Sequence, residues 1–171
     1  FVVLLFHLNC PAITGGFIGV DVFFVISGFL ITRLIVKELE QTGSFNFINF
    51  YCRRIKRIFP ALFFVLLCTL IAGLILFAPS HLRALGRSMG MAALSLSNCL
   101  FWLESGYFNA TATYKPLLHT WSLGVEEQFY FIWPFILFFI ATKLNKKWLP
   151  VAVGVLGLIS LGLNIAFQKI I

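Results

Sequence analysis

Residues Phe17 to Val36 read FIGVDVFFVISGFLITRLIV, an almost unbroken apolar run. A helix that crosses the hydrocarbon core of a bilayer needs about 20 mostly apolar residues, so this run predicts a transmembrane helix. Phe1 to Leu8 has the character of the second half of another span, whose first half is expected to precede it. Three further apolar runs predict spans at 61–77, 128–142 and 151–168. The sequence therefore predicts an all-α, polytopic integral membrane protein with about five transmembrane helices.

The composition excludes a water-soluble fold. Of the 171 residues, 60% are hydrophobic and 11% are charged, and the mean hydropathy is +0.98, far from the balance of soluble domains. The net charge of +7 does not indicate nucleic acid, because the basic residues cluster beside apolar runs, as they do where a protein anchors to anionic lipid. The cysteines have neither metal-ligand spacing nor the density of a disulfide scaffold, so no metal site is expected. They are Cys10, Cys52, Cys68 and Cys99.

The basic residues also predict the orientation of the spans. Cytoplasmic loops are enriched in Lys and Arg, and we therefore expect residues 37–60 to be a cytoplasmic basic segment. Residues 1–36 then form a helical hairpin with an outer turn, where Gly15 and Gly16 support a tight reversal, and 61–77 spans back to the outer side. The cations of the segment are Lys37, Arg53, Arg54, Lys56 and Arg57.

The stretch from His81 to Leu103 is long enough to cross a membrane but is interrupted by arginine, glycine and small polar residues. If it crossed, the next span would place Lys143 and its basic neighbours outside. We therefore expect an outer amphipathic or re-entrant segment. Residues 78–127 are then extracytoplasmic or interfacial, and 128–168 supply two spans.

An ionisable group within a bilayer is costly unless it is paired or hydrated, so each one is a candidate for function. His7 lies shortly before the outer turn and Asp21 a similar distance after it, so the two side chains can share one depth. A carboxylate beside an imidazole fixes its tautomer and raises its basicity, as a general base for a hydroxyl requires. A structural hydrogen-bonded pair is the alternative, and the spacing does not separate the two interpretations.

Arg54 and Arg57 are three residues apart and would share one face of a helix, where two guanidinium groups could bind a phosphate. Anchoring to lipid headgroups explains such a cluster equally simply. Glu126 and Glu127 enter a span without a neighbouring cation, so one of them is expected to face a wet cavity, while the other caps the helix start. Ser27 has no activating base near it in sequence and is a weak candidate for a nucleophile.

Three separated motifs, in order, make the sequence similar to the acyltransferase 3 family of membrane O-acyltransferases. They are Phe6-His7-Leu8 followed by GGFIGVDVFFVISGFLIT at 15–32, then Phe50-Tyr51 through Ala61, and PLLHTWSLGVEEQFY at 116–130. The resemblance implies transfer of an acetyl or short acyl group from cytoplasmic acetyl-CoA or another acyl-CoA, with no bound cofactor. The implied acceptor is a hydroxyl of a cell-surface carbohydrate, of the lipopolysaccharide, exopolysaccharide or peptidoglycan type, and the implied location is the bacterial cytoplasmic (inner) membrane.

The same resemblance implies roles for individual residues. His7 and Glu126 correspond to catalytic positions, and Arg54 and Arg57 to a donor-binding pair. An arginine that completes the first motif of the family would fall before Phe1, and the family has about twice as many spans, so residues 1–171 are expected to be a partial transmembrane acyltransferase domain that is inactive alone. The positions expected to shape the site are Gly15, Gly16, Asp21, Ser27, Trp121, Ser122 and Glu127.

Two other functions are compatible with these residues. A transporter or flippase could use the same polar groups to pass an acyl group or a lipid-linked sugar without bond chemistry, and a non-catalytic subunit could use the basic cluster to dock a partner. Consumption of the thioester distinguishes an enzyme from both.

Overall fold

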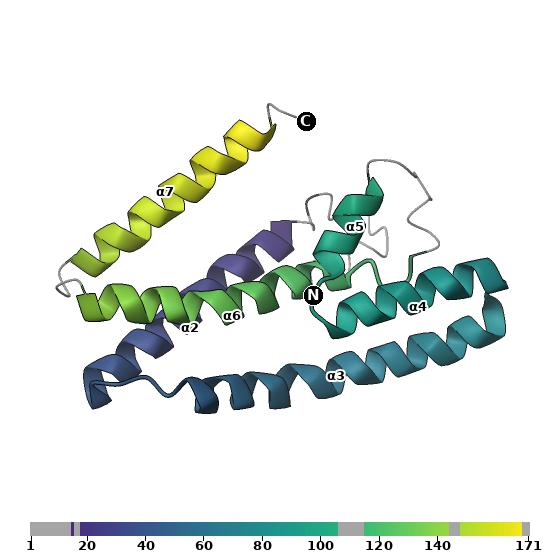
Figure 1. Cartoon of the computed structure of the whole chain (residues 1–171), viewed down its shortest axis with the longest axis horizontal. Coiled ribbons are helices and arrows are strands. Elements are labelled where there is room, and N and C mark those ends of the chain that lie inside the picture. Colours follow the sequence, from purple (N-terminus) through teal and green to yellow (C-terminus); the bar gives the residue numbers. More distant parts are fainter. Residues whose placement is uncertain (1–14, 16–17, 106–114, 144–147, 169–171) are drawn as a thin grey trace. The chain divides into compact units, whose positions relative to one another are not determined.

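The computed structural model describes residues 15, 18–105, 115–143 and 148–168. The span predicted at Phe1 to Leu8, and with it His7 and Gly16, lies outside the described residues. Every regular element in the described ranges is a helix, as the sequence predicts. Figure 1 shows six of these helices, labelled α2 to α7.

Helix α2 (Ile18–Thr42) contains the whole run predicted from Phe17 onward except its first residue. It ends where Gly43 adopts φ 71°, a conformation open to glycine, and the Gly43 N–H bonds the Leu39 carbonyl at 3.0 Å. Helix α3 (Phe47–Leu76) begins after Asn46, whose side chain accepts a hydrogen bond from the Asn49 N–H at 2.9 Å. The basic segment is therefore mostly helical, formed by the end of α2 and the start of α3.

Helix α3 joins a basic beginning to the apolar run predicted at 61–77. Its 30 residues correspond to about 45 Å at 1.5 Å per residue, longer than the roughly 30 Å hydrocarbon core of a bilayer. Part of α3 therefore projects beyond the hydrocarbon, or the helix is tilted.

Two short helices occupy the stretch from His81 to Leu103. Helix α4 (Pro79–Ala93) has proline at its first turn, and helix α5 (Ser97–Ser105) follows a turn in which Ser95 adopts φ 58°. Neither helix reaches the length of a span. The apolar side of α4 packs against α3, which agrees with the amphipathic character expected of this stretch.

Helices α6 (Thr120–Lys143) and α7 (Leu149–Gln168) correspond to the last two predicted spans. Three helices, α2, α3 and α6, are long and apolar enough to cross a membrane, whereas the described apolar part of α7, Pro150–Ala166, is shorter. These lengths and compositions are those of an integral membrane protein. The total of about five spans stays a prediction.

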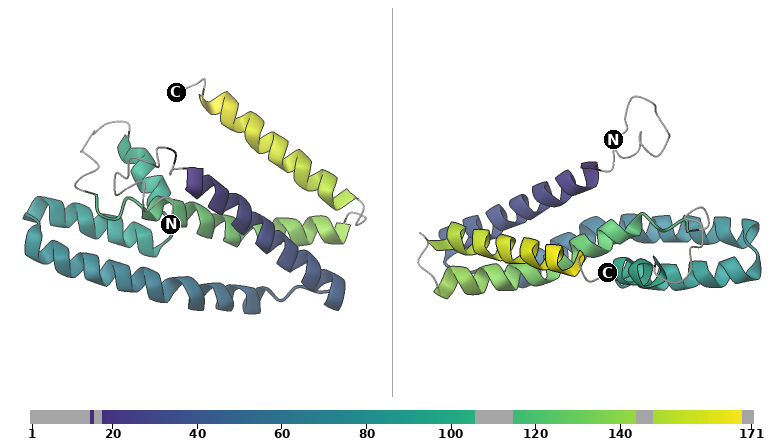
Figure 2. Two further views of the ribbon diagram at one scale, coloured as in Figure 1. Left: turned by 180° about the vertical axis from the view of Figure 1, so that it is seen from behind. Right: turned by 90° about the horizontal axis from the view of Figure 1, so that it is seen from above.

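The chain divides into two compact units: residues 1–31 with 46–131, and residues 32–45 with 132–171. In the first unit α3 and α4 lie side by side (Figures 1 and 2), and Gly73 permits the close approach because a Cβ there would collide with Leu85. In the second unit the Trp133 indole donates a hydrogen bond to the Thr32 hydroxyl at 2.8 Å. The buried cluster of the first unit consists of Leu62, Leu66, Leu85, Ala92 and Leu117.

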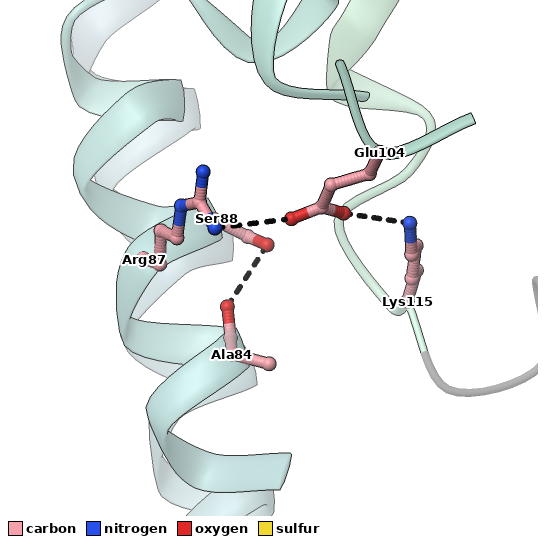
Figure 3. A network of polar contacts seen from close by, with 5 residues as sticks. All are labelled: Ala84, Arg87, Ser88, Glu104 and Lys115. Carbon is pink, nitrogen blue, oxygen red and sulfur yellow. Dashed lines mark hydrogen bonds and ion pairs between the residues drawn. The ribbon is translucent and has the colours of Figure 1, made fainter. Parts of the chain in front are cut away.

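One ion-pair network in the first unit joins α4 and α5 to the residues that lead into α6 (Figure 3). Glu104 accepts from the Lys115 ammonium at 2.6 Å, and its other oxygen lies 3.8 Å from the Arg87 guanidinium. Lys115 also lies over the Phe101 ring, 5.6 Å from its centroid. The network fixes the approach of the chain to the start of α6.

Candidate active site

A cavity of about 530 Å³ lies within the first unit, between α2, α3 and the beginning of α6. Its volume is in the range of small-molecule sites. Most of its wall is apolar, and a small number of polar groups point into it, which is the usual construction of a binding or catalytic pocket. Polar lining residues are Ser27, Arg54, Arg57, His119, Thr120, Ser122, Glu126 and Tyr130.

Arg54 and Arg57 line the cavity from the same face of α3. The Arg54 guanidinium lies 4.8 Å from the centroid of the Tyr130 ring and 5.6 Å from that of Phe50, so two aromatic rings hold its plane. Arg53 and Lys56, on the same helix, are exposed and do not line the cavity. Arg54 and Arg57 therefore line the cavity, whereas Arg53 and Lys56 lie on α3 outside the cavity wall.

Glu126 is the buried acid of the cavity, with 7% of its surface exposed. The Tyr130 hydroxyl donates a hydrogen bond to its Oε1, and the Ser27 side chain and the Arg54 guanidinium are near enough to interact with the carboxylate. Burial of a carboxylate is tolerated only with partners of this kind. The Ser27 hydroxyl also donates to the Phe24 carbonyl of its own helix at 3.1 Å, and a hydroxyl engaged in this way is not an activated nucleophile.

Glu127 points to a different neighbour. Its Oε2 accepts from the Ser95 hydroxyl at 3.4 Å, and it is absent from the cavity wall. Adjacent residues on a helix point about 100° apart, so the two consecutive carboxylates serve different surroundings.

The next residue, Gln128, contacts the turn between α4 and α5. Its amide donates to the Ser95 carbonyl and to Asn98 Oδ1, both at 2.9 Å, and accepts from Asn98 Nδ2 at 3.1 Å. Four residues earlier Gly124 is buried, and a Cβ there would lie 3.0 Å from Asn98 Oδ1 and 3.2 Å from the Ser95 carbonyl oxygen. A Cβ at this position would crowd the turn, which approaches the backbone of α6 closely.

A third side of α6 contacts α2. The Trp121 ring meets Phe24 edge to face, with centroids 6.2 Å apart, and the Phe129 ring lies 3.8 Å from where a Cβ of Gly28 would be. Side chains of the motif at 116–130 therefore face three different surroundings, which are the cavity, the turn between α4 and α5, and α2.

His119 is a cavity residue that the sequence reasoning did not single out. Its Nδ1 lies 3.1 Å from the Pro116 carbonyl oxygen, an arrangement that favours the proton on Nδ1 and leaves Nε2 as an acceptor. The one sequence feature that could have indicated His119 as a site residue was its place in the motif, shortly before the predicted span. The sequence does not show that this end of α6 lines a cavity.

Of the other predicted site residues in the described ranges, some line the cavity and others do not. Ser122 lines the cavity, and its hydroxyl donates to the His119 carbonyl at 3.2 Å. Asp21 and Gly15 are exposed and do not line the cavity. Within the described ranges, no group of three or more His, Cys, Asp or Glu side chains is arranged to hold a metal ion.

Comparisons with known proteins agree with the motifs. A family model described as an acyltransferase domain matches residues 1–171. O-acetyltransferase OatA of Staphylococcus aureus strain NCTC 8325 / PS 47 is 37% identical over 169 residues, which make up 98% of this chain and 28% of that protein. A putative O-acetyltransferase of S. aureus strain COL is 37% identical over 146 residues, or 85% of this chain and 24% of that protein. The chain spans about a quarter of the length of these curated relatives. No solved structure matches it.

Proposed function

This chain belongs to the acyltransferase 3 family, and from that premise we propose that the complete protein moves an acetyl or short acyl group from acyl-CoA to a carbohydrate hydroxyl. The proposed acceptor is a cell-surface carbohydrate, or its lipid-linked precursor, of the lipopolysaccharide, exopolysaccharide or peptidoglycan type. The proposed location is the bacterial cytoplasmic membrane. The names of the relatives, O-acetyltransferases, support acyl transfer to oxygen.

The observation that carries the proposal is the meeting of Arg54 and Glu126 in one cavity. The sequence predicts that Arg54 belongs to a cytoplasmic segment and Glu126 to an extracytoplasmic one. Both predictions hold together only if the cavity lies within the thickness of the membrane and is reached from both sides. Such a cavity suits a donor that is made in the cytoplasm and an acceptor that is displayed outside.

The donor would bind on the α3 side. Two guanidinium groups at the cavity wall can bind phosphate oxygens through paired charge-assisted hydrogen bonds, and coenzyme A carries several phosphates. The contact of Arg54 with two aromatic rings holds one guanidinium in place before the donor arrives, which reduces the ordering cost of binding.

In the proposed reaction, His7 removes the proton of the sugar hydroxyl, and the oxygen attacks the thioester carbonyl directly or after an acyl-enzyme has formed. An ester C–O bond forms, the thioester C–S bond breaks, and the proton passes to the sulfur of coenzyme A. Glu126, held by Tyr130, faces the same cavity and would orient the acceptor or the base.

The test of the reaction uses the purified complete protein, acetyl-CoA with a labelled acetyl group, and candidate acceptor sugars. We expect the thioester to be cleaved only when an acceptor is present, with the label recovered as an ester. A transporter would move the label across a vesicle membrane and leave the thioester intact. The variant His7→Ala should insert normally and lose transfer, and transfer retained in His7→Ala would overturn the assignment of the base.

The donor site is tested by two double variants that remove the same charge from the same helix. Arg54→Gln with Arg57→Gln removes the cavity pair, and Arg53→Gln with Lys56→Gln removes the exposed pair. We expect the KM for acyl-CoA to rise at least about tenfold in the first variant, because hydrogen bonds to charged groups are lost, and to change less than about twofold in the second. Equal effects would show that the arginines only anchor the protein to lipid.

A further inference from the structure

Gly124, Glu127 and Gln128 belong to the motif at 116–130 but have no role in the proposed chemistry. All of them face the turn between α4 and α5, and none lines the cavity. This turn has an unusual backbone, because Ser95 adopts φ 58°, which residues other than glycine rarely adopt. A conformation of that kind persists only where its surroundings determine it, and here its carbonyl accepts from the Gln128 amide.

The contacts between the turn and α6 are directional. Both donor positions of the Gln128 amide are used, one on the Ser95 carbonyl and one on Asn98 Oδ1, and its oxygen accepts from Asn98 Nδ2. Two side-chain amides that bond each other reciprocally fix a distance and an orientation, unlike an apolar contact, which tolerates sliding. The missing side chain at Gly124 brings the backbone of α6 against the same turn.

These contacts determine the rotation of α6 about its own axis. A helix turns by about 100° for each residue, so a rotation of that size would bring Glu127 to the direction of Glu126 and turn Glu126 away from the cavity. Other polar contacts of α6 include a hydrogen bond from the Thr120 hydroxyl to the Ser97 hydroxyl and one from the Tyr51 hydroxyl to the Phe131 carbonyl, both at 2.9 Å. The contacts of Gln128 lie next to the two carboxylates, and the close approach of the turn at Gly124 adds a steric limit on the same side.

We propose that Gln128, acting through Asn98 and the Ser95 turn, is a positioning residue that holds α6 in the rotation that directs Glu126 into the cavity and Glu127 out of it. The catalytic consequence rests on the proposed function, whereas the rotation itself does not. Gln128 needs no contact with either substrate. Its role is to select which of two consecutive carboxylates meets them.

The rotation is tested by crosslinking, which requires no activity. In a complete protein whose cysteines have been replaced by serine, the pair Ser27→Cys with Glu126→Cys is compared with Ser27→Cys with Glu127→Cys, using a short bifunctional methanethiosulfonate reagent. We expect the first pair to crosslink at least about fivefold faster, because neighbouring side chains point about 100° apart. Adding Gln128→Leu should bring the two rates within about twofold of each other. An unchanged ratio would overturn the proposal.

The catalytic consequence is tested by kinetics with a rescue. Gln128→Leu should lower kcat about tenfold or more, as misplaced catalytic groups do. The KM for acyl-CoA should rise by a smaller factor, because rotation of α6 also moves the Tyr130 ring that contacts Arg54. The same substitution at an exposed glutamine, Gln41→Leu, is the control. Exchanging the two amides, Asn98→Gln with Gln128→Asn, restores a reciprocal pair and should recover kcat to within about threefold.

The two tests separate the possible failures. Loss of activity in Gln128→Leu without a change in crosslinking, or without rescue by the exchange, would reduce Gln128 to a general packing role. A complete protein that never cleaves the thioester would refute the proposed function but leave the crosslinking result valid. If Gln128→Leu fails to insert, Gln128→Asn, which keeps an amide and shortens it, is used in its place with the same expected directions.

Discussion

The first half of α6 and the whole of α7 are both apolar, but the side chains of α6 contact other parts of the chain on several sides, whereas those of α7 are mostly exposed. From Thr120 to Phe131, α6 directs one side to a cavity, another to the turn between α4 and α5, and a third to α2. In α7 nearly every described side chain is exposed. An exposed apolar helix of this kind suits lipid or further helices. The difference shows that the buried polar residues of α6, and not polar residues as such, mark where an apolar helix contacts other parts of the chain.

The largest expected effect separates the two carboxylates of α6. Glu126→Gln should lower kcat by about a hundredfold or more, the size expected when reacting groups lose their orientation, whereas Glu127→Gln should lower it less than about tenfold because that carboxylate only supports the turn. Both should insert normally. Steady-state kinetics of the complete protein measure the difference, and a larger loss for Glu127→Gln would reverse our assignment.

Tyr130→Phe is expected to have a smaller effect on the same side of α6. The substitution removes the hydroxyl that donates to Glu126 and keeps the ring beneath Arg54. Losing one hydrogen bond to a charged group corresponds to about 1.5–3 kcal/mol, so kcat should fall at least about tenfold while the KM for acyl-CoA stays constant. A rise in that KM alone would mean that the hydroxyl serves donor binding instead.

A pair of glycine substitutions compares the two helices directly. Gly124→Ala places a Cβ against Asn98 and Ser95, and overpacking of this kind costs about 1–3 kcal/mol, so the apparent Tm in detergent should fall by a few degrees. Gly157→Ala in α7 meets no atom within 4 Å and should leave Tm unchanged or raise it slightly, because alanine favours helix. Thermal unfolding of both variants measures this, and equal losses would contradict the close approach at Gly124.

The smallest expected effect lies in α7. Asn164 is an exposed polar residue of that helix, and Asn164→Leu makes its surface more compatible with lipid. We expect kcat and KM to remain within about twofold of the parent protein. A tenfold loss would show that α7 carries part of the site, and the contrast between α6 and α7 would then fail.

The sequence predicted the all-helical architecture and three of the apolar runs, because apolar length is a property of the chain alone. The run beginning at Phe17 coincides with α2 from Ile18 onward, and the run beginning at Gln128 falls within α6. The boundaries were harder to predict: α3 begins at Phe47 and not at Ala61, since an amphipathic basic helix continues without interruption into an apolar one. Only the change in hydropathy near Ala61 distinguishes the basic part of α3 from its apolar part.

The candidate site was only partly predictable. Helical spacing correctly placed Arg54 and Arg57 on one side of α3, and the family motif supplied Glu126 as a candidate. No local sequence pattern, however, shows that the arginines of α3 and the carboxylate of α6 line the same cavity. The contacts of Gln128 were also not predictable, because its partner Asn98 lies 30 positions away in the sequence. The roles assigned to the site residues, including His7, which lies outside the described residues, stay predictions.

The position of Arg54 and Arg57 on the cavity wall has a consequence for the integrity of the membrane. A water-filled passage open to both faces would conduct protons and cations down the membrane potential. Fixed positive charges within such a passage raise an electrostatic barrier against that leak, as arginine does in selective pores, while still admitting anions. The pair that would attract the phosphates of a donor would therefore also limit the leak of protons and cations between turnovers.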